Sequence, residues 1–157
     1  MNKIPMTSSG YEKLQEELKK LINEDRPNII AAIAEARSHG DLSENAEYQY
    51  AKEQQSLIEG KIQELESTSG LAEIIDISQL SGKAIIFGAT IEIEDNDLGI
   101  KSKYQIVGEY ESDINNKKLS INSPLARGLI GKTKDDIVEV VSPKGTKSYS
   151  VLSVKFI

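Results

Sequence analysis

The sequence contains no cysteine, no tryptophan and a single histidine, and aromatic residues make up only 5% of its 157 positions. Without cysteine, the chain can form neither disulfide bonds nor thiolate metal sites. The low aromatic content indicates a thin core, which suits an elongated helical hairpin better than a sphere. An apolar N-terminal h-region and any run of 18 apolar residues are also absent, so we expect a cytoplasmic protein without membrane association.

The charge of the chain is acidic and unevenly distributed. The formal net charge is -6. Residues 1–80 contain 15 Asp and Glu against 8 Lys and Arg, a net of -7, whereas residues 81–157 contain 10 against 11, a net of +1. An acidic chain is poorly suited to wrap free duplex nucleic acid, because that binding is driven by phosphate neutralisation. The balance is compatible with docking on a basic protein surface.

Two amphipathic helical segments flank residues 36–48. In the first, apolar residues recur at three- and four-residue steps from Tyr11 to Ala36, and Pro27 predicts a break or kink between them. The second has a heptad-like apolar stripe at Ala51, Ile58, Ile62, Leu65 and Ala72. Two such stripes with a short connection are expected to pack antiparallel and to form arms of about 45 Å.

Beyond residue 80 the apolar period changes from helical to two. We predict strands at residues 85–87, 90–94, 103–107, 137–141 and 148–152. Ser123 as N-cap and Pro124 at the first helical position, followed by a closing glycine, predict one short helix. The fold class is therefore α+β, with an antiparallel α-helical coiled-coil hairpin at residues 1–78 and a small antiparallel sheet domain with one short helix at residues 79–157.

Asp41 and Glu44 lie three positions apart in the connection between the arms. Judged on spacing alone, the favoured interpretation is a capping box, with Asp41 as N-cap and Glu44 at the third helical position. A metal role is also geometrically possible, but two carboxylates are too few to hold Mg²⁺, which requires octahedral oxygen ligation. If these residues bind a metal, a partner must supply most of the ligands. That interpretation predicts a split site rather than a self-contained enzyme pocket.

Other polar residues surround the acidic pair. Arg37 and Lys52 lie one on each arm and would form a small basic spot for one or two phosphates if they face the same way, although pairing with acidic neighbours is an equal alternative. For His39, interaction with the end of a helix is favoured over metal ligation. Tyr48 and Tyr50 are expected to pack the arms together, with stacking on a base as the alternative.

Residues 32–48 (AIAEARSHGDLSENAEY) and 51–55 (AKEQQ) resemble the GreA/GreB family of bacterial transcript cleavage factors. Residues 4–7 (IPMT) and 122–132 (NSPLARGLIGK) show the same resemblance, which extends over the whole chain. It implies a transcription elongation factor, not itself an enzyme, that binds RNA polymerase and inserts its hairpin into the secondary channel. There it stimulates endonucleolytic cleavage of the 3′ end of backtracked RNA and rescues arrested elongation complexes.

The resemblance also implies roles for individual residues near the hairpin end. Asp41 and Glu44 match the family's two acids, which help to hold a second Mg²⁺ shared with the polymerase active site and orient a water molecule. The protein would have no cofactor of its own. Arg37 and Lys52 match the family's basic patch, which contacts the 3′ segment of the nascent RNA. Lysine stands at position 52 where arginine is frequent, so bidentate phosphate contact is lost there.

Asn122, Ser123 and Pro124 match the loop that docks the C-terminal domain on the polymerase rim. The resemblance implies an FKBP-like fold for that domain, without isomerase activity, and we expect the free protein to be a monomer. Two other classes stay open from the sequence. One is an FKBP-like isomerase or chaperone carried by residues 81–157. The other is a structural adaptor or channel-binding inhibitor that binds polymerase without stimulating cleavage.

Overall fold

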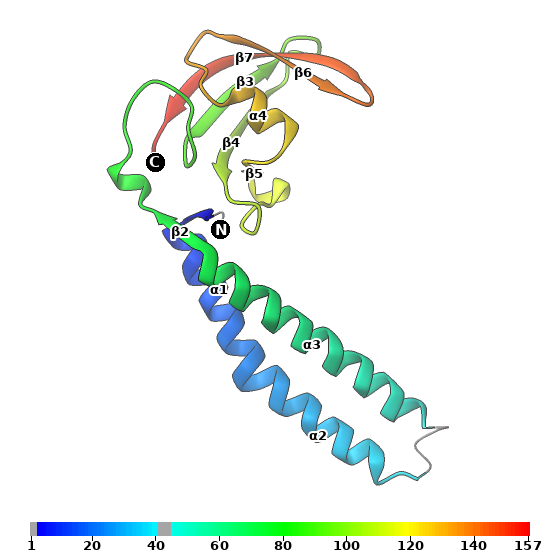
Figure 1. Ribbon diagram of the computed structural model, residues 1–157. Helices are drawn as coiled ribbons and strands as arrows, with labels where there is room; N and C mark the ends of the chain where they lie inside the picture. Colours follow the sequence, from blue (N-terminus) through cyan, green and yellow to red (C-terminus); the bar gives the residue numbers. More distant parts are fainter. Residues whose placement is uncertain (1–2, 41–44) are drawn as a thin grey trace. The chain divides into compact units, whose positions relative to one another are not determined.

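The computed structural model describes residues 3–40 and 45–157 (Figure 1). The chain divides into two compact units, one around residues 11–72 and one that joins residues 3–10 to residues 73–157. The predicted domains, residues 1–78 and 79–157, stay a prediction. The two compact units do not test them, because a compact unit is not by itself a folding domain. Within the described ranges, no helix is both long and apolar enough to cross a membrane.

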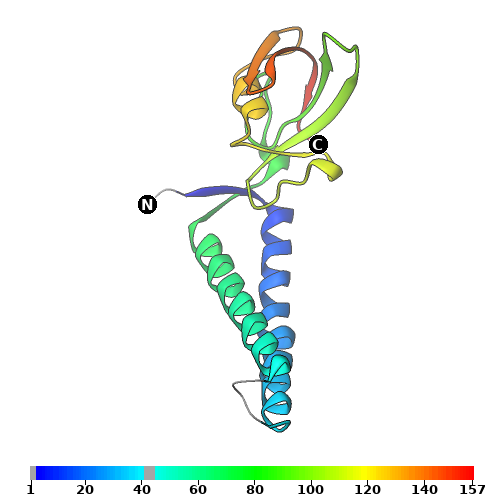
Figure 2. The ribbon, with the colours of Figure 1, turned by 90° about the vertical axis from the view of Figure 1, so that its right-hand side faces the viewer.

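The first unit is an antiparallel helical hairpin, as predicted (Figures 1 and 2). Its first arm consists of α1 (Ser8–Lys20), a π-helical turn (Leu21–Asp25) and α2 (Arg26–Arg37), and its second arm is α3 (Ala46–Leu71). The buried seam between the arms is lined by Leu14, Leu21, Ile33, Ala36, Ala51, Ile62 and Leu65. These residues come from the two apolar stripes, so burial of the stripes against each other holds the arms together.

The first arm does not break at Pro27. Lys20, Asp25 and Arg26 all have right-handed helical dihedral angles, so the chain remains helical through this region. Pro27 lies in the first turn of α2, where the N–H that proline lacks is least needed. The irregularity falls instead on the preceding residues, Leu21–Asp25, where the helix widens to a π turn.

Polar contacts also join the two arms. The Arg26 guanidinium donates from Nε and Nη2 to the two Glu59 carboxylate oxygens, at 2.8 and 2.9 Å. These hydrogen bonds hold the pKa of Glu59 below its ordinary range. Further from the connection between the arms, Gln15 Nε2 donates to Ser69 Oγ at 2.7 Å. Because an exposed ion pair contributes little free energy, these contacts serve mainly to fix the alignment of the arms.

The second unit contains a five-stranded sheet with the order β5-β4-β3-β7-β6. The strands are β3 (Thr90–Asp95), β4 (Lys101–Val107), β5 (Lys118–Ser120), β6 (Ile137–Ser142) and β7 (Gly145–Lys155). The prediction of a wholly antiparallel sheet is wrong at one edge, because β5 pairs with β4 in parallel. The chain reaches β5 through a turn that includes the short 3-10 helix Ile114–Asn116, rather than through a tight hairpin.

Alternation along β3 shows how the sheet forms its core. Ile91 and Ile93 are buried, while Thr90, Glu92 and Glu94, which alternate with them, are half-exposed. The short helix α4 (Pro124–Leu129) packs Ala126 and Leu129 into the same core, and Ser123 caps it as predicted by accepting a hydrogen bond from Ala126 N at 3.2 Å. The α+β fold class is thereby confirmed.

The strand predicted at residues 85–87 is wrong. Ile85 is fully buried, and its segment forms two backbone hydrogen bonds with Gly131 and Lys132, each 2.8 Å long, without becoming part of a strand. Gly82 and Gly88 bracket the segment with φ angles of 117° and 90°, which turn the chain away from an extended path on both sides. Apolar composition therefore predicted burial correctly and secondary structure incorrectly.

A two-stranded sheet that the sequence did not predict joins β1 (Ile4–Thr7) to β2 (Ala72–Ile75), which precedes a 3-10 turn at Ile77–Gln79. Glu111 anchors β1, because its carboxylate accepts hydrogen bonds from Thr7 N at 2.9 Å, from Thr7 Oγ1 and from Gly108 N at 3.0 Å. Thr7 Oγ1 in turn accepts from Gly10 N and so caps the start of α1.

Candidate functional site

The end of the hairpin combines described and undescribed residues. The predicted acidic pair, Asp41 and Glu44, lies outside the described residues. On either side of the pair, the chain is described up to Gly40 and again from Asn45. In the described part of the chain, no group of three or more His, Asp or Glu residues is placed to hold a metal ion.

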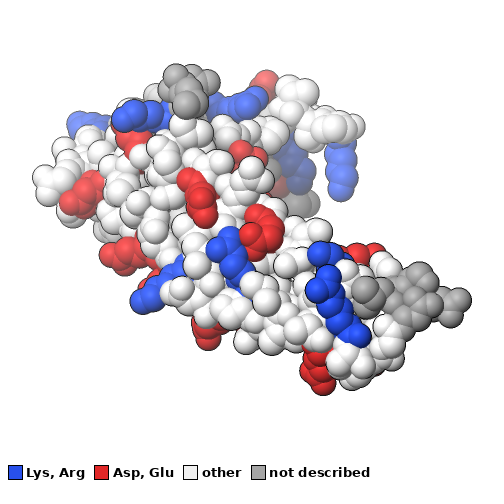
Figure 3. All heavy atoms as spheres, turned by 60° about the horizontal axis from the view of Figure 1, so that its bottom comes forward, with Lys and Arg blue, Asp and Glu red and all other residues white. Residues whose placement is uncertain are grey.

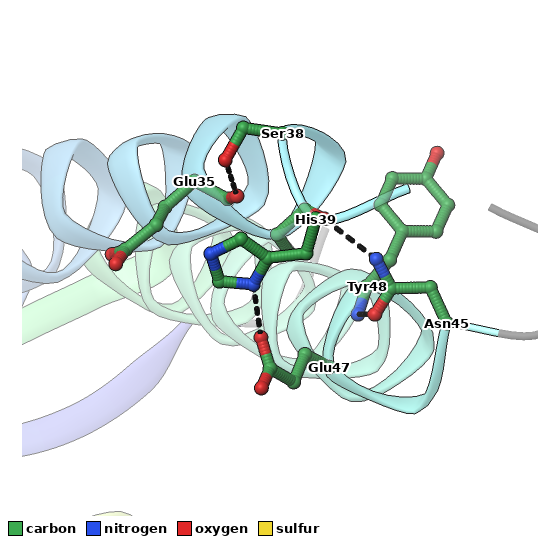
Figure 4. A network of polar contacts seen from close by, with 7 residues as sticks. Glu35, Ser38, His39, Asn45, Glu47 and Tyr48 are labelled. Atoms are coloured by element: carbon green, nitrogen blue, oxygen red, sulfur yellow. Dashed lines mark hydrogen bonds and ion pairs between the residues drawn. The ribbon is translucent and has the colours of Figure 1, made fainter. Parts of the chain in front are cut away.

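Asn45 is the N-cap of α3. Its Oδ1 accepts a hydrogen bond from Tyr48 N at 3.1 Å, and its Nδ2 donates to the Ala36 carbonyl oxygen at 2.6 Å (Figure 4). The capping interpretation of the sequence, with Asp41 as N-cap, is therefore wrong, because the helix begins at Ala46. The residue missed by the sequence reasoning carried a usable signal, since asparagine directly before a helical segment is among the preferred caps.

His39 and Glu47 form a second contact across the hairpin end. The His39 Nδ1 atom lies 2.8 Å from Glu47 Oε2, and both side chains are largely exposed (Figure 4). His39 follows the end of α2 by two residues, but its ring faces the opposite arm rather than the carbonyl groups of its own helix. Together with the bond from Asn45 to Ala36, this contact joins the two arms close to the last residues described before position 41 and the first described after position 44.

The two basic residues predicted at the site lie on one side of the hairpin. The Arg37 guanidinium lies over the Tyr48 ring, 5.8 Å from its centroid. Lys52 follows Tyr48 by one helical turn and so shares its face of α3. Neither basic residue forms an ion pair with another described residue, and Lys52 Nζ donates to Gln55 Oε1 at 3.2 Å. On the face in Figure 3, basic and acidic side chains both lie near the hairpin end.

The two tyrosines near the hairpin end differ in their surroundings. Tyr48 is half-buried under Arg37, which agrees with the packing role predicted for it. Tyr50 is 64% exposed, so it does not pack between the arms. The alternative of stacking against a base stays a prediction for both tyrosines, and Tyr50 is the more exposed of the two.

The predicted docking loop lies in the second unit. Ser123 Oγ donates to the Ser120 carbonyl oxygen at 2.7 Å, and Asn122 Nδ2 donates to Glu109 Oε2 at 3.2 Å. Asn122 and Pro124 are exposed, whereas Ser123 is half-buried. The hydroxyl of Ser123 is thus occupied by the loop and by the cap of α4, while its two neighbours present their surfaces to solvent.

Comparison with known families accounts for both units. A family model for the N-terminal part of transcription elongation factors matches residues 4–74, and one for the C-terminal part of GreA/GreB matches residues 80–156. The chain belongs to the GreA/GreB family of transcription elongation factors. The hairpin and the sheet domain are therefore the two parts of one transcription elongation factor.

Individual members of the GreA/GreB family resemble the chain over its full length. The transcription elongation factor GreA of Beijerinckia indica is 58% identical over 156 residues, which cover 99% of each chain. That of Caulobacter sp. strain K31 is 52% identical over all 157 residues. The crystal structure of GreA factor homolog 1 of Thermus thermophilus is 26% identical and covers 98% of this chain and 99% of that one, with a TM-score of 0.45. The assignment rests on the sequence matches.

Proposed function

We propose that this elongation factor acts directly on RNA polymerase by stimulating cleavage of backtracked RNA. The hairpin enters the secondary channel, and its end brings Asp41 and Glu44 to the polymerase active site. The 3′ segment of the transcript is then cut, and a new reactive 3′ end restarts elongation. The protein works in the cytoplasm, where it contributes ligands to the polymerase and carries no catalytic centre of its own.

The observation that carries this proposal is the position of the two acids in the sequence. They fall in the short connection between α2 and α3, beyond the pair of contacts that closes the arms at Ala36 and His39. The 26 residues of α3 span about 39 Å at 1.5 Å per residue, so the arm is long enough to carry side chains deep into a channel.

The carboxylates fit a metal-assisted reaction because Mg²⁺ prefers hard oxygen ligands. The ion shared with the polymerase would supply charge stabilisation for the phosphodiester displacement. Asp41 and Glu44 would hold it and orient the attacking water. Arg37 and Lys52, on the Tyr48 side of the hairpin, would contact phosphates of the RNA 3′ segment.

The second unit would dock the factor on the rim of the polymerase through Asn122, Ser123 and Pro124. The exposure of Asn122 and Pro124 supports this role, since both side chains reach solvent, where Asn122 also donates from Nδ2 to Glu109 Oε2. The hydrogen bonds of Ser123 within its own loop support a different role for that residue, namely keeping the loop in shape.

A cleavage assay on a stalled, backtracked elongation complex tests the proposal. The double variant Asp41→Asn with Glu44→Gln removes both charges and keeps side-chain size. We expect the cleavage rate to fall by about 10- to 100-fold, the range commonly seen when a group that supports a bound metal is lost. The matched control is Glu35→Gln with Glu53→Gln, which removes two exposed charges from the arms close by and should leave cleavage within about twofold.

Binding to polymerase is measured in parallel by competition with labelled wild-type protein. Both double variants should compete as well as the wild type does. Undiminished cleavage by the Asp41→Asn, Glu44→Gln variant would contradict the donated-carboxylate mechanism. A wild-type protein that binds but never stimulates cleavage would instead identify a channel-binding inhibitor.

A further inference from the structure

A basic cleft lies in the second unit, away from the docking loop in sequence. Its volume is about 550 Å³, and its lining includes Lys83, Lys134 and Lys155 together with Gly82, Thr133 and Ser153. The volume lies in the range typical of small-molecule sites. Three separate segments each contribute one lysine, so the cluster is a product of the fold and not of a charge run in the sequence.

Backbone hydrogen bonds hold these three segments together. Ile85 N donates to the Lys132 carbonyl oxygen, which ties the segment of Lys83 to the segment of Lys134 at 2.8 Å. Asp135 N donates to the Val151 carbonyl oxygen at 2.8 Å and Val151 N to that of Asp136 at 2.9 Å, which ties the Lys134 turn to β7, the strand of Lys155. These bonds fix the backbones of the three segments relative to one another, so the three exposed lysines are carried around one cavity before any ligand binds.

The positive charge in the cleft is not neutralised by described residues. Lys83, Lys134 and Lys155 form no ion pair with any residue in the described ranges, whereas Lys147 of the same unit pairs with Asp95 at 3.6 Å. Of the two acids that follow Lys134, Asp136 accepts at Oδ2 from Thr133 N at 2.8 Å and from Thr133 Oγ1 at 3.2 Å, and neither Asp135 nor Asp136 forms an ion pair with a described lysine. Glu92, which lies opposite Ser153 across β3 and β7, forms no ion pair with these lysines.

We infer that this cleft binds a compact polyphosphate, either inorganic or the phosphate tail of a nucleotide. Three unpaired ammonium groups around one cavity repel each other, and a multiply charged anion relieves that repulsion. Lysine binds phosphate as a point charge, while the absence of arginine from the lining disfavours bidentate recognition of a carboxylate. Among the described residues, no aromatic side chain lines the cleft to stack on a base, so recognition is of the phosphates.

Titration of the free, full-length protein with sodium tripolyphosphate tests this inference without polymerase, so its outcome is independent of the cleavage proposal. Amide chemical shifts in a ¹⁵N-labelled sample are followed at constant ionic strength, with sodium chloride as the reference. We expect saturable shifts concentrated at residues 82–83, 133–134 and 153–155. The variant Lys134→Ala with Lys155→Ala should weaken binding by about tenfold or more, because two charge-assisted contacts are lost.

The matched control is Lys101→Ala with Lys144→Ala, which removes the same charge from exposed positions outside the cleft lining and should bind within about twofold of wild type. Thermal unfolding checks that both variants are folded. Shifts spread evenly over surface lysines, or equal weakening by both variants, would overturn the site. ATP serves as the second probe: affinity similar to tripolyphosphate supports phosphate recognition, and much tighter binding of ATP would overturn that chemistry.

Discussion

Two glycines lie close to the Glu111 carboxylate, and neither position has room for a side chain. A Cβ atom at Gly10 would lie 2.1 Å from Glu111 Oε1, and one at Gly108 would lie 2.4 Å from the Pro5 carbonyl oxygen. The first clash involves the end of a flexible side chain, which can move only by giving up its hydrogen bonds to Thr7. The second involves backbone, which cannot move without displacing β1. Glycine is therefore required here by close approach rather than by backbone dihedral angles.

Gly108→Ala is expected to lower the free energy of unfolding by about 1–3 kcal/mol, the usual cost of overpacking a filled site. Gly60→Ala is the control, because Gly60 lies within α3 and a Cβ atom there meets nothing within 4 Å. That substitution should stabilise the protein by about 1 kcal/mol through helix propensity. Urea denaturation of the full-length variants measures both, and a harmless Gly108→Ala would show that β1 is not held as tightly as its contacts indicate.

Asp95 closes the turn between β3 and β4. Burial acts to raise the pKa of Asp95, but hydrogen bonds from the N–H groups of Leu98 and Asp97, with Lys147 nearby, outweigh it and hold that pKa below its ordinary range. A lowered pKa in the folded state means that the charged carboxylate contributes stability above the pKa of the unfolded chain. This contribution disappears as the pH falls through the folded-state pKa.

The wild type should therefore lose more stability than Asp95→Asn when the pH is lowered from 7 into the range below about pH 4. Lys147→Ala should show an intermediate pH dependence, because it removes the ammonium group and leaves both backbone donors in place. Thermal unfolding followed by circular dichroism at several pH values makes the comparison. Identical pH profiles for the wild type and Asp95→Asn would contradict the role assigned to this carboxylate.

At the hairpin end, single residues were predicted unevenly from the sequence. The placement of Arg37 and Lys52 on opposite arms followed from helical periodicity and fits the structure. The cap was misassigned to Asp41 because a carboxylate three positions before Glu44 fits the capping-box spacing as well as Asn45 fits a simple cap. The contact of His39 with Glu47 joins residues on different arms, and periodicity within either arm does not indicate it.

Among the helices and strands, α3 gives the clearest link between burial and stability. Leu65 is fully buried in the seam, while Leu57, on the same helix, is 66% exposed. Leu65→Ala should cost about 2–5 kcal/mol of unfolding free energy, since it removes buried apolar surface and leaves a cavity between the arms. Leu57→Ala should stay within about 0.5 kcal/mol of wild type.

Urea denaturation followed by far-ultraviolet circular dichroism compares these two variants. The substitution, the helix and the change in propensity are the same in both, so the difference isolates burial. Equal stabilities would show that the seam is not packed as the structure places it.

Long elements with a clear period were predictable, and short elements with distant partners were not. The strands β3, β4, β6 and β7 are rich in β-branched and aromatic residues and are connected in pairs by turns with suitable residues. In contrast, β1 and β2 are four residues long and pair across the whole hairpin sequence. The three-residue β5 pairs in parallel with β4. Local patterns do not encode such pairings, because tertiary context decides them.

Over the whole chain, the excess of acidic residues lies in residues 1–80, which include the hairpin, and the cluster of lysines that line the cleft lies in the sheet domain. The sequence showed the first as a difference in net charge between its halves. It could not show the second, because Lys83, Lys134 and Lys155 are separated along the chain and meet only through the fold. The family resemblance implied roles for Asp41, Glu44 and the docking loop, and it implied none for these lysines.

The anchoring of β1 by Glu111 has a consequence for recombination between genes of this family. Thr7 and Glu111 are 104 positions apart, yet both belong to the second compact unit. A single crossover near position 72 would join the β1 of one parent to the Gly108–Glu111 segment of another and so mix the two sides of this anchor. Two crossovers, near residues 11 and 72, would exchange the hairpin as a cassette and leave the anchor in one lineage. Recombination can therefore exchange the hairpin without separating Thr7 from Glu111, because the hairpin is an insertion within the sequence of the other unit.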